Sequence, residues 1–185
     1  MRPAVTRSAA ALRPARGLTL VECMVALAVL GILTGLAATG WQQTQVRRHL
    51  DGVAAQFETD VQFTRSLAVA RNEALRLEFD GRAGAGCYVV HNGSAGGCTC
   101  GTSGPAACTG SSEALRVVRL EGASGVRMAA NVAAIVFDPQ QGTSTPAGTL
   151  RIEAADGSAS VRQIVNIMGR VRSCSPDGVS GYKAC

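Results

Sequence analysis

The sequence predicts an α+β protein in which one long N-terminal helix packs on an antiparallel sheet or sandwich. Three observations support this class: a nearly uncharged run at 18–41, a helical rhythm of apolar residues at 42–74, and short β-rich runs at 75–185. Turn residues, and not helical segments, separate the β-rich runs, which argues against βαβ units. We therefore expect a helical spine followed by a β-rich head.

The run from Leu18 to Trp41 has the length and polarity of a membrane-spanning helix. Glu22 is its only formal charge, and a helix of this length rises roughly 36 Å, enough to cross a bilayer core of about 30 Å. Four arginines and no acidic residue occupy positions 1–17. The positive-inside rule therefore predicts a cytoplasmic N-terminus, with the rest of the chain facing outward.

Glu22 is the unusual residue of this run, because a lone carboxylate in hydrocarbon costs on the order of 2.5–3.5 kcal/mol. It requires a cation, and cleavage after Gly17 would create one at the α-amino group of Leu18. A secretory signal peptide is one alternative, but its apolar core is shorter. A generic single-pass anchor is another, but it does not explain Glu22.

Residues 42–74 continue the helix with an amphipathic pattern. Apolar or small residues recur at spacings of three and four, with charged residues between them. This stripe comprises Val46, Leu50, Val53, Phe57, Val61, Thr64 and Ala68. We predict a single helix from about Leu18 to Asn72, whose second half packs on the head.

The head contains seven runs with strand character, bounded by Gly, Pro, Asp and Ser. They are Leu75–Phe79, Cys87–His91, Leu115–Leu120, Val126–Met128, Val132–Phe137, Thr149–Ala154 and Ser160–Met168. Pro139 in Phe137-Asp138-Pro139 cannot donate to a sheet ladder, so it ends the fifth run.

Six of the seven cysteines lie in the segment predicted to face outward, where disulfides persist. They are Cys87, Cys98, Cys100, Cys108, Cys174 and Cys185, whereas Cys23 lies in the predicted membrane helix. Sequence proximity favours Cys174 with Cys185 and pairs among the other four, but six cysteines allow 15 connectivities. A bond between Cys98 and Cys100 is not expected.

Composition and motifs argue against several other functions. Four of the 18 basic residues lie in residues 1–17, which leaves 14 against 13 acidic residues, so no global charge favours nucleic acid. Cys-Thr-Cys lacks the usual zinc spacing and no His accompanies it. The two histidines, His49 and His91, accompany no nucleophile motif, and no phosphate-binding glycine motif is present. We expect no catalysis, metal or cofactor.

The C-terminus holds the one candidate binding site, Gly169-Arg170-Val171-Arg172. In extended backbone Arg170 and Arg172 project to the same side, about 6.5 Å apart. Two guanidinium groups in this arrangement suit successive phosphates, and Arg162 and Lys183 are further candidates to add charge. With few aromatic residues for base stacking, the predicted contact is to the DNA backbone and independent of sequence.

The N-terminal segment resembles that of type IV pilins and of the pseudopilins of type II secretion. The resemblance is carried by the basic leader, Gly17, Leu18 and Glu22, although the family usually has Phe where this chain has Leu18. It implies that a prepilin peptidase cuts after Gly17 and that Leu18 becomes the N-methylated terminus. It also implies that Glu22 guides assembly with other pilins or pseudopilins.

Together with Phe137-Asp138-Pro139 and the C-terminal arginines, this segment resembles the GspH/FimT family of minor pilins and minor pseudopilins. In the FimT branch, a C-terminal Gly-Arg-x-Arg motif, here Gly169, Arg170, Val171 and Arg172, is associated with DNA binding during natural transformation. The resemblance implies a pilin-like fold, insertion in the inner membrane with a periplasmic head, and later a place in a pilus or pseudopilus at the cell surface.

Three functions remain open at this point. The first is a minor type IV pilin that assists assembly and binds incoming DNA through Arg170 and Arg172. The second is a minor pilin that only primes or caps the filament. The third is the H-type pseudopilin of a type II secretion machine. The alternative for the arginine motif itself is a turn glycine followed by an edge strand kept soluble by its charges.

Overall fold

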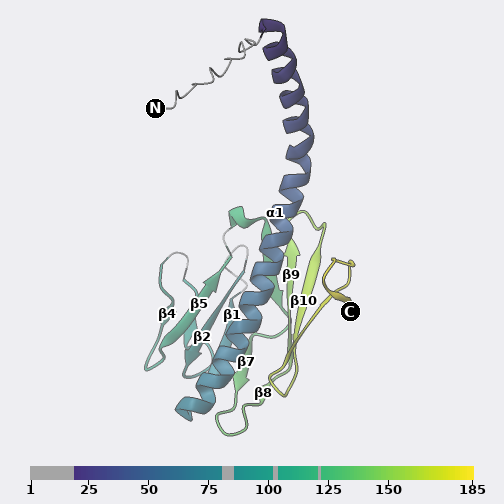
Figure 1. The fold of residues 1–185 in the computed structure, drawn as a ribbon. Helices are drawn as coiled ribbons and strands as arrows, with labels where there is room; N and C mark the ends of the chain where they lie inside the picture. Colours follow the sequence, from purple (N-terminus) through teal and green to yellow (C-terminus); the bar gives the residue numbers. More distant parts are fainter. Residues whose placement is uncertain (1–18, 81–85, 102–103, 121) are drawn as a thin grey trace, which may run out of the picture. The chain divides into compact units, whose positions relative to one another are not determined.

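The computed structural model describes residues 19–80, 86–101, 104–120 and 122–185 (Figure 1). By its internal contacts the chain divides into two compact units, residues 1–41 and 42–185. Gly17 and Leu18 lie outside the described residues, so the predicted processing site stays a prediction.

One helix, α1 (Leu20–Arg71), runs through both units, close to the predicted bounds. In the first unit its large apolar side chains, such as Leu20, Leu27 and Ile32, are exposed. Among the described residues, no helix is both long and apolar enough to cross a membrane. The predicted membrane span at 18–41 is therefore not confirmed and stays a prediction.

The second unit contains two five-stranded sheets, here called sheet 1 and sheet 2. Sheet 1 is antiparallel throughout, in the order β5-β2-β1-β7-β8. Its strands are β1 (Leu75–Asp80), β2 (Cys87–Asn92), β5 (Ala114–Arg119), β7 (Ala134–Phe137) and β8 (Ser144–Thr145). Strand β7 ends at Phe137, before Pro139, as predicted.

Sheet 2 has the order β12-β11-β10-β9-β6 and is antiparallel except for the pair β11–β12. Its strands are β6 (Val126–Ala130), β9 (Gly148–Ala154), β10 (Ser160–Val165), β11 (Val171–Ser175) and β12 (Lys183–Ala184). The remaining elements are the two-stranded ribbon β3 (Cys98–Thr99) and β4 (Ala107–Cys108) and the 3-10 helix η1 (Gly122–Ser124).

The half of α1 from residue 42 onward packs against the strands, and Figure 1 shows it in front of them, with β1, β2 and β5 to one side and β9 and β10 to the other. Of the predicted stripe, Leu50, Phe57, Val61, Thr64 and Ala68 are fully buried. The predicted α+β class with an antiparallel head is confirmed.

Asn72 explains why α1 ends where it does. It has a left-handed φ of 51°, and its N–H donates to the carbonyl of Val69 at 3.3 Å. The N–H of Glu73 donates to the carbonyl of Ala68 at 3.1 Å. These two bonds form a Schellman cap, which satisfies carbonyls of the last turn and turns the chain into β1.

A buried polar network joins α1 to sheet 1. Asp60 is inaccessible to solvent, yet it accepts a hydrogen bond from the hydroxyl of Tyr88 at 2.6 Å and pairs with Arg116 at 2.7 Å. Gln56 donates to the same carboxylate at 3.0 Å. Burial, and then the bond to Asp60, raises the pKa of Tyr88 well above its ordinary value. The network satisfies a charge that would otherwise be costly to bury.

Candidate functional site

The predicted arginine motif lies in the hairpin between β10 and β11. The sequence prediction extended the strand to Met168, and this is wrong, because β10 ends at Val165 and Asn166 begins a turn. The Asn166 side chain accepts hydrogen bonds from the N–H groups of Met168 and Arg170, each at 3.0 Å. A side chain that bonds its own backbone in this way competes with a strand ladder, and so forms the turn.

Gly169 completes this turn for a steric reason. Its φ is +69°, a region that residues with a Cβ rarely adopt. An added Cβ would lie 3.1 Å from both Cδ of Arg65 and the carbonyl oxygen of Gly142. The glycine of the motif is therefore required by the backbone and by the close approach of α1.

Strand β8 also holds the hairpin. The hydroxyl of buried Ser144 donates to the carbonyl of Asn166 at 2.6 Å, and its N–H donates to the carbonyl of Ile167 at 2.9 Å. Ile167 and Met168 remain exposed at the tip. The turn that precedes Arg170 is thus held by its own Asn166, by α1 and by sheet 1.

Arg170 and Arg172 are both exposed. Arg172 lies in β11 opposite Ile164, and the carbonyl of Arg170 accepts a hydrogen bond from the N–H of Asn166 at 3.0 Å. Within the part of the chain that the structure describes, neither guanidinium group has a hydrogen bond or ion-pair partner. Two residues apart along extended chain, they present unpaired charge on the same side.

The structure brings Arg162 and Lys183 to the same sheet as the motif. Arg162 in β10 lies opposite Cys174 in β11, and Cys174 in turn lies opposite Lys183 in β12. Arg151, which the sequence reasoning missed, lies opposite Arg162 in β9. Only the strand register reveals it, since alternating charge and apolar residues in Leu150–Glu153 are ordinary for a half-exposed strand.

The disulfide Cys174–Cys185 fixes the C-terminus beside this group of arginines. The same segment contacts α1, because Tyr182 donates to Asp51 at 3.0 Å and Arg47 donates to the carbonyl of Ser180 at 2.5 Å. Burial, and then the bond to Asp51, raises the pKa of Tyr182 to about 12. Lys183 follows directly and is held between these attachments.

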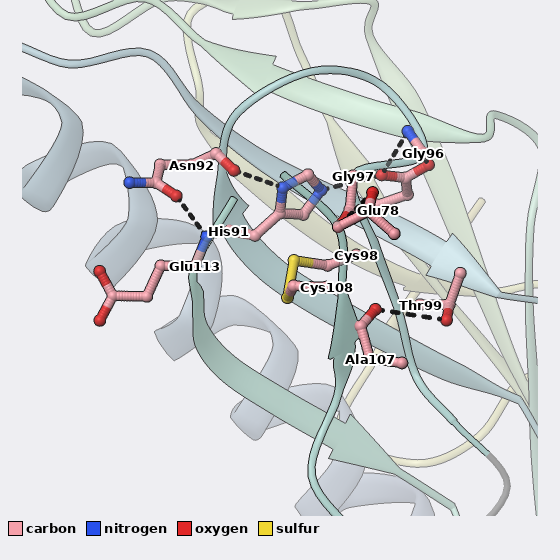
Figure 2. Close-up of a disulfide and its surroundings, with 11 residues drawn as sticks. Glu78, His91, Asn92, Gly96, Gly97, Cys98, Thr99, Ala107, Cys108 and Glu113 are labelled. Carbon is pink, nitrogen blue, oxygen red and sulfur yellow. Dashed lines mark hydrogen bonds and ion pairs between the residues drawn. A yellow bond between two sulfur atoms is a disulfide. The ribbon is translucent and has the colours of Figure 1, made fainter. Parts of the chain in front are cut away.

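The other two disulfides, Cys87–Cys100 and Cys98–Cys108, lie on the opposite side of the head, over sheet 1. Figure 2 shows the second of them next to buried His91, whose Nε2 lies 2.8 Å from Glu78 and whose Nδ1 lies 2.8 Å from the carbonyl of Asn92. Glu78 also accepts the N–H of Gly96 at 2.9 Å. His91 is therefore engaged in holding this loop.

Two further residues named in the sequence analysis, Glu22 and Cys23, lie near the start of α1. Glu22 lies in the first turn of α1, and its N–H donates to the Thr19 hydroxyl at 3.2 Å, an N-cap bond. Cys23 is an exposed free thiol. No group of three or more His, Cys, Asp or Glu side chains among the described residues is placed to hold a metal ion.

Comparison with known proteins identifies two family models in the sequence. The model of type II transport protein GspH matches residues 53–169, and the prokaryotic N-terminal methylation motif matches residues 12–38. The first match covers more than half of the chain. It begins within α1, at residue 53, and ends at the hairpin glycine, Gly169. No curated protein sequence matches the chain.

Solved structures with a similar fold include the minor pseudopilin EpsH from the type 2 secretion system of Vibrio cholerae. Its TM-score is 0.50 at 12% identity, over 69% of this chain and 98% of EpsH. The type IV minor pilin FimU of Pseudomonas aeruginosa PAO1 has a TM-score of 0.49 at 19% identity, over 68% of this chain and 88% of FimU. From the match over residues 53–169, together with the methylation motif, the chain belongs to the GspH family of minor pilins and pseudopilins.

Proposed function

We propose that this protein is a FimT-like minor type IV pilin whose head binds DNA without sequence specificity through Arg170 and Arg172. One observation carries the proposal: a hairpin fixed by Asn166, Gly169 and Ser144 presents two exposed arginines that have no partner among the described residues. Arg116, by contrast, is engaged with the buried carboxylate of Asp60.

The N-terminal part of the proposal is processing and assembly. A prepilin peptidase cleaves after Gly17, and the amino group of Leu18 is methylated and meets Glu22 of a neighbouring subunit. The methylation-motif match over residues 12–38 supports this. The processed protein passes from the inner membrane, with its head in the periplasm, into a pilus. Its role is structural and in binding, not catalytic.

The test is a titration of fluorescein-labelled duplex DNA with the full-length protein and the variant Arg170→Ala with Arg172→Ala. Because each phosphate contact contributes about 0.9 to the slope of log K against log salt, the variant should lose about 1.8 of that slope. Its melting temperature should stay unchanged. A matched control, Arg48→Ala with Arg71→Ala, removes two exposed charges from α1 and should bind as wild type. Equal binding by both double variants would refute the proposal.

A second candidate function is that of an H-type minor pseudopilin in type II protein secretion. The observation in its favour is the match to the family described as type II transport protein GspH. A deletion strain separates the two functions. Loss of natural transformation with intact protein secretion supports the pilin, whereas loss of secretion with intact transformation supports the pseudopilin.

A further inference from the structure

The outward face of sheet 2 carries more positive charge than the arginine motif alone. Alternate residues of β9 and β10 are buried, namely Leu150, Ile152, Val161, Gln163 and Val165. The residues between them therefore project from the other face. This outward face includes Arg151 and Arg162, which are exposed and half-buried respectively.

The strand register places Arg151, Arg162 and Lys183 in one row. Arg151 is opposite Arg162, Arg162 is opposite Cys174, and Cys174 is opposite Lys183. Directly opposed residues of neighbouring strands lie side by side on one face. Arg151, Arg162 and Lys183, here called the basic row, therefore cross β9, β10, β11 and β12 at right angles to the strands.

The dimensions of the basic row suit a phosphodiester backbone. Strands lie about 4.8 Å apart, so the three spacings from β9 to β12 span roughly 14 Å. The phosphates of one strand of duplex DNA are spaced about 3.4 Å along the helix axis and further apart through space, so the row is long enough to contact more than one of them. Arg172, two residues from Cys174, lies beside the row and connects it to Arg170.

The charges of the basic row are poorly compensated within the sheet. Arg151 and Arg162 oppose each other directly, an arrangement that destabilises a sheet unless an anion lies between or above them. Glu153 is the one acidic residue on the strands of sheet 2 and pairs with Arg151 at 2.8 Å. Arg162 and Lys183 have no such partner among the described residues.

We infer that DNA lies across sheet 2 along the basic row, so that the interface extends from the hairpin over β9 to β12. This inference rests on the DNA binding proposed above and adds Arg151, Arg162 and Lys183 to its contacts. The row lies on a sheet held by hydrogen bonds and by the disulfide Cys174–Cys185, so its spacing exists before the ligand arrives. Glu153 faces the same ligand and opposes it.

The experiment compares full-length wild type with Arg162→Gln and Lys183→Gln together, by anisotropy of a short labelled duplex over roughly 50 to 200 mM salt. The double variant should lower the salt slope by about 1.8 and weaken binding on the order of tens-fold at about 0.1 M salt. The matched control is Arg48→Gln with Arg71→Gln on α1, which removes the same charge and should leave both values unchanged.

A second variant, Glu153→Gln, should change DNA affinity in the opposite direction. It keeps the inference falsifiable if the double variant folds poorly. Removing this carboxylate frees Arg151 for phosphate, so affinity should rise several-fold and the salt slope should increase by about 0.9. Unchanged or weaker binding by Glu153→Gln would contradict the row.

The outcomes separate this inference from the function on which it rests. If Arg170→Ala with Arg172→Ala loses DNA while Arg162→Gln with Lys183→Gln binds as wild type, the row is wrong and the proposed function stands. If wild type itself binds no DNA, both fall. Binding to phosphatidylglycerol vesicles that is lost in the row variant, with DNA binding unchanged, would assign the row to a lipid surface and overturn the inference.

Discussion

The outward faces of the two sheets differ in what covers them. Over sheet 1, residues 93–101 and 104–110 are held by two disulfides and by Arg119, which donates to the carbonyls of Cys100 and Gly104. Over sheet 2, the outward strand positions include Arg151, Arg162 and Lys183 together with the one acidic residue, Glu153. The cysteine-rich segment therefore covers one side of the head, whereas the charged face of sheet 2 is open.

The covered face explains why β2 is buried on both sides. Tyr88 and Val90 point toward α1 and the core, whereas Cys87, Val89 and His91 lie beneath the loop, and all five are buried. A buried imidazole needs partners, which Glu78 and the carbonyl of Asn92 supply. His91 and Glu78 are therefore engaged in holding the covering segment in place.

The largest expected effect comes from removing the cover of sheet 1 by changing Cys87, Cys98, Cys100 and Cys108 to Ser. Each disulfide of this loop size contributes about 3 kcal/mol, so the free energy of unfolding in urea should fall severely. DNA affinity should be unchanged at temperatures where the variant is folded.

The matched control for that prediction is Cys174→Ser with Cys185→Ser, which leaves the cover intact. It should lower stability less and reduce the salt slope of DNA binding by about 0.9, because β12 and Lys183 are no longer fixed. If the loop variant lost DNA binding and the C-terminal variant retained it in full, the division between a closed and an open face would be wrong.

An intermediate effect is expected from Gly169→Ala, at the hairpin beside the charged face of sheet 2. The residue must keep a φ of +69°, and its Cβ would press on Arg65 and Gly142. The left-handed backbone alone costs an alanine roughly 1–2 kcal/mol, and the contacts add to it.

Gly157→Ala is the internal reference for Gly169→Ala. Gly157 has a similar φ of +74°, but nothing lies within 4 Å of an added Cβ. Thermal unfolding should therefore show a smaller loss for Gly157→Ala. Only Gly169→Ala should also weaken DNA binding, since it displaces Arg170. Equal losses in the two variants would show that the contacts with Arg65 and Gly142 are unimportant.

The smallest effect concerns Tyr182, which joins the C-terminal segment to α1. Its folded pKa of about 12 exceeds the ordinary value of 10.0, so the neutral hydroxyl stabilises the fold fully below pH 10. This contribution is lost as the pH rises from 10 to 12. Tyr182→Phe should cost about 0.5 kcal/mol near neutral pH, and the difference from wild type in urea midpoint should shrink above pH 10. A difference independent of pH would exclude the bond to Asp51 as its cause.

The sequence was sufficient for the helix and for most strands, because their periodicity is local. Leu50, Phe57 and Val61 recur as a helix requires, and all three are buried. The failure at β10 has an equally local reason. Ile167 and Met168 continue the apolar run, so it reads as strand, whereas the bonds of Asn166 turn the chain and leave both side chains exposed.

The candidate site could be predicted only in part. Arg170 and Arg172 are neighbours in sequence, so extended backbone alone places them together. Arg151 is opposed to Arg162 through the register of β9 with β10, and Lys183 reaches the row through β12, a strand of two residues. A strand of two residues is too short to show an alternation of apolar and polar residues. The strand register depends on pairs of residues distant in sequence, which a single sequence does not reveal.

The place of β12 has a consequence for when the head is complete. This strand joins β11 through the pairs Cys174–Lys183 and Ser175–Ala184 and is closed by the bond from Cys174 to Cys185. Under reducing conditions that covalent closure is absent, and β12 then depends on these two pairs and on the bond from Tyr182 to Asp51. Formation of the Cys174–Cys185 bond therefore fixes the position of Lys183 at the edge of sheet 2, although it leaves the charge of that side chain unchanged.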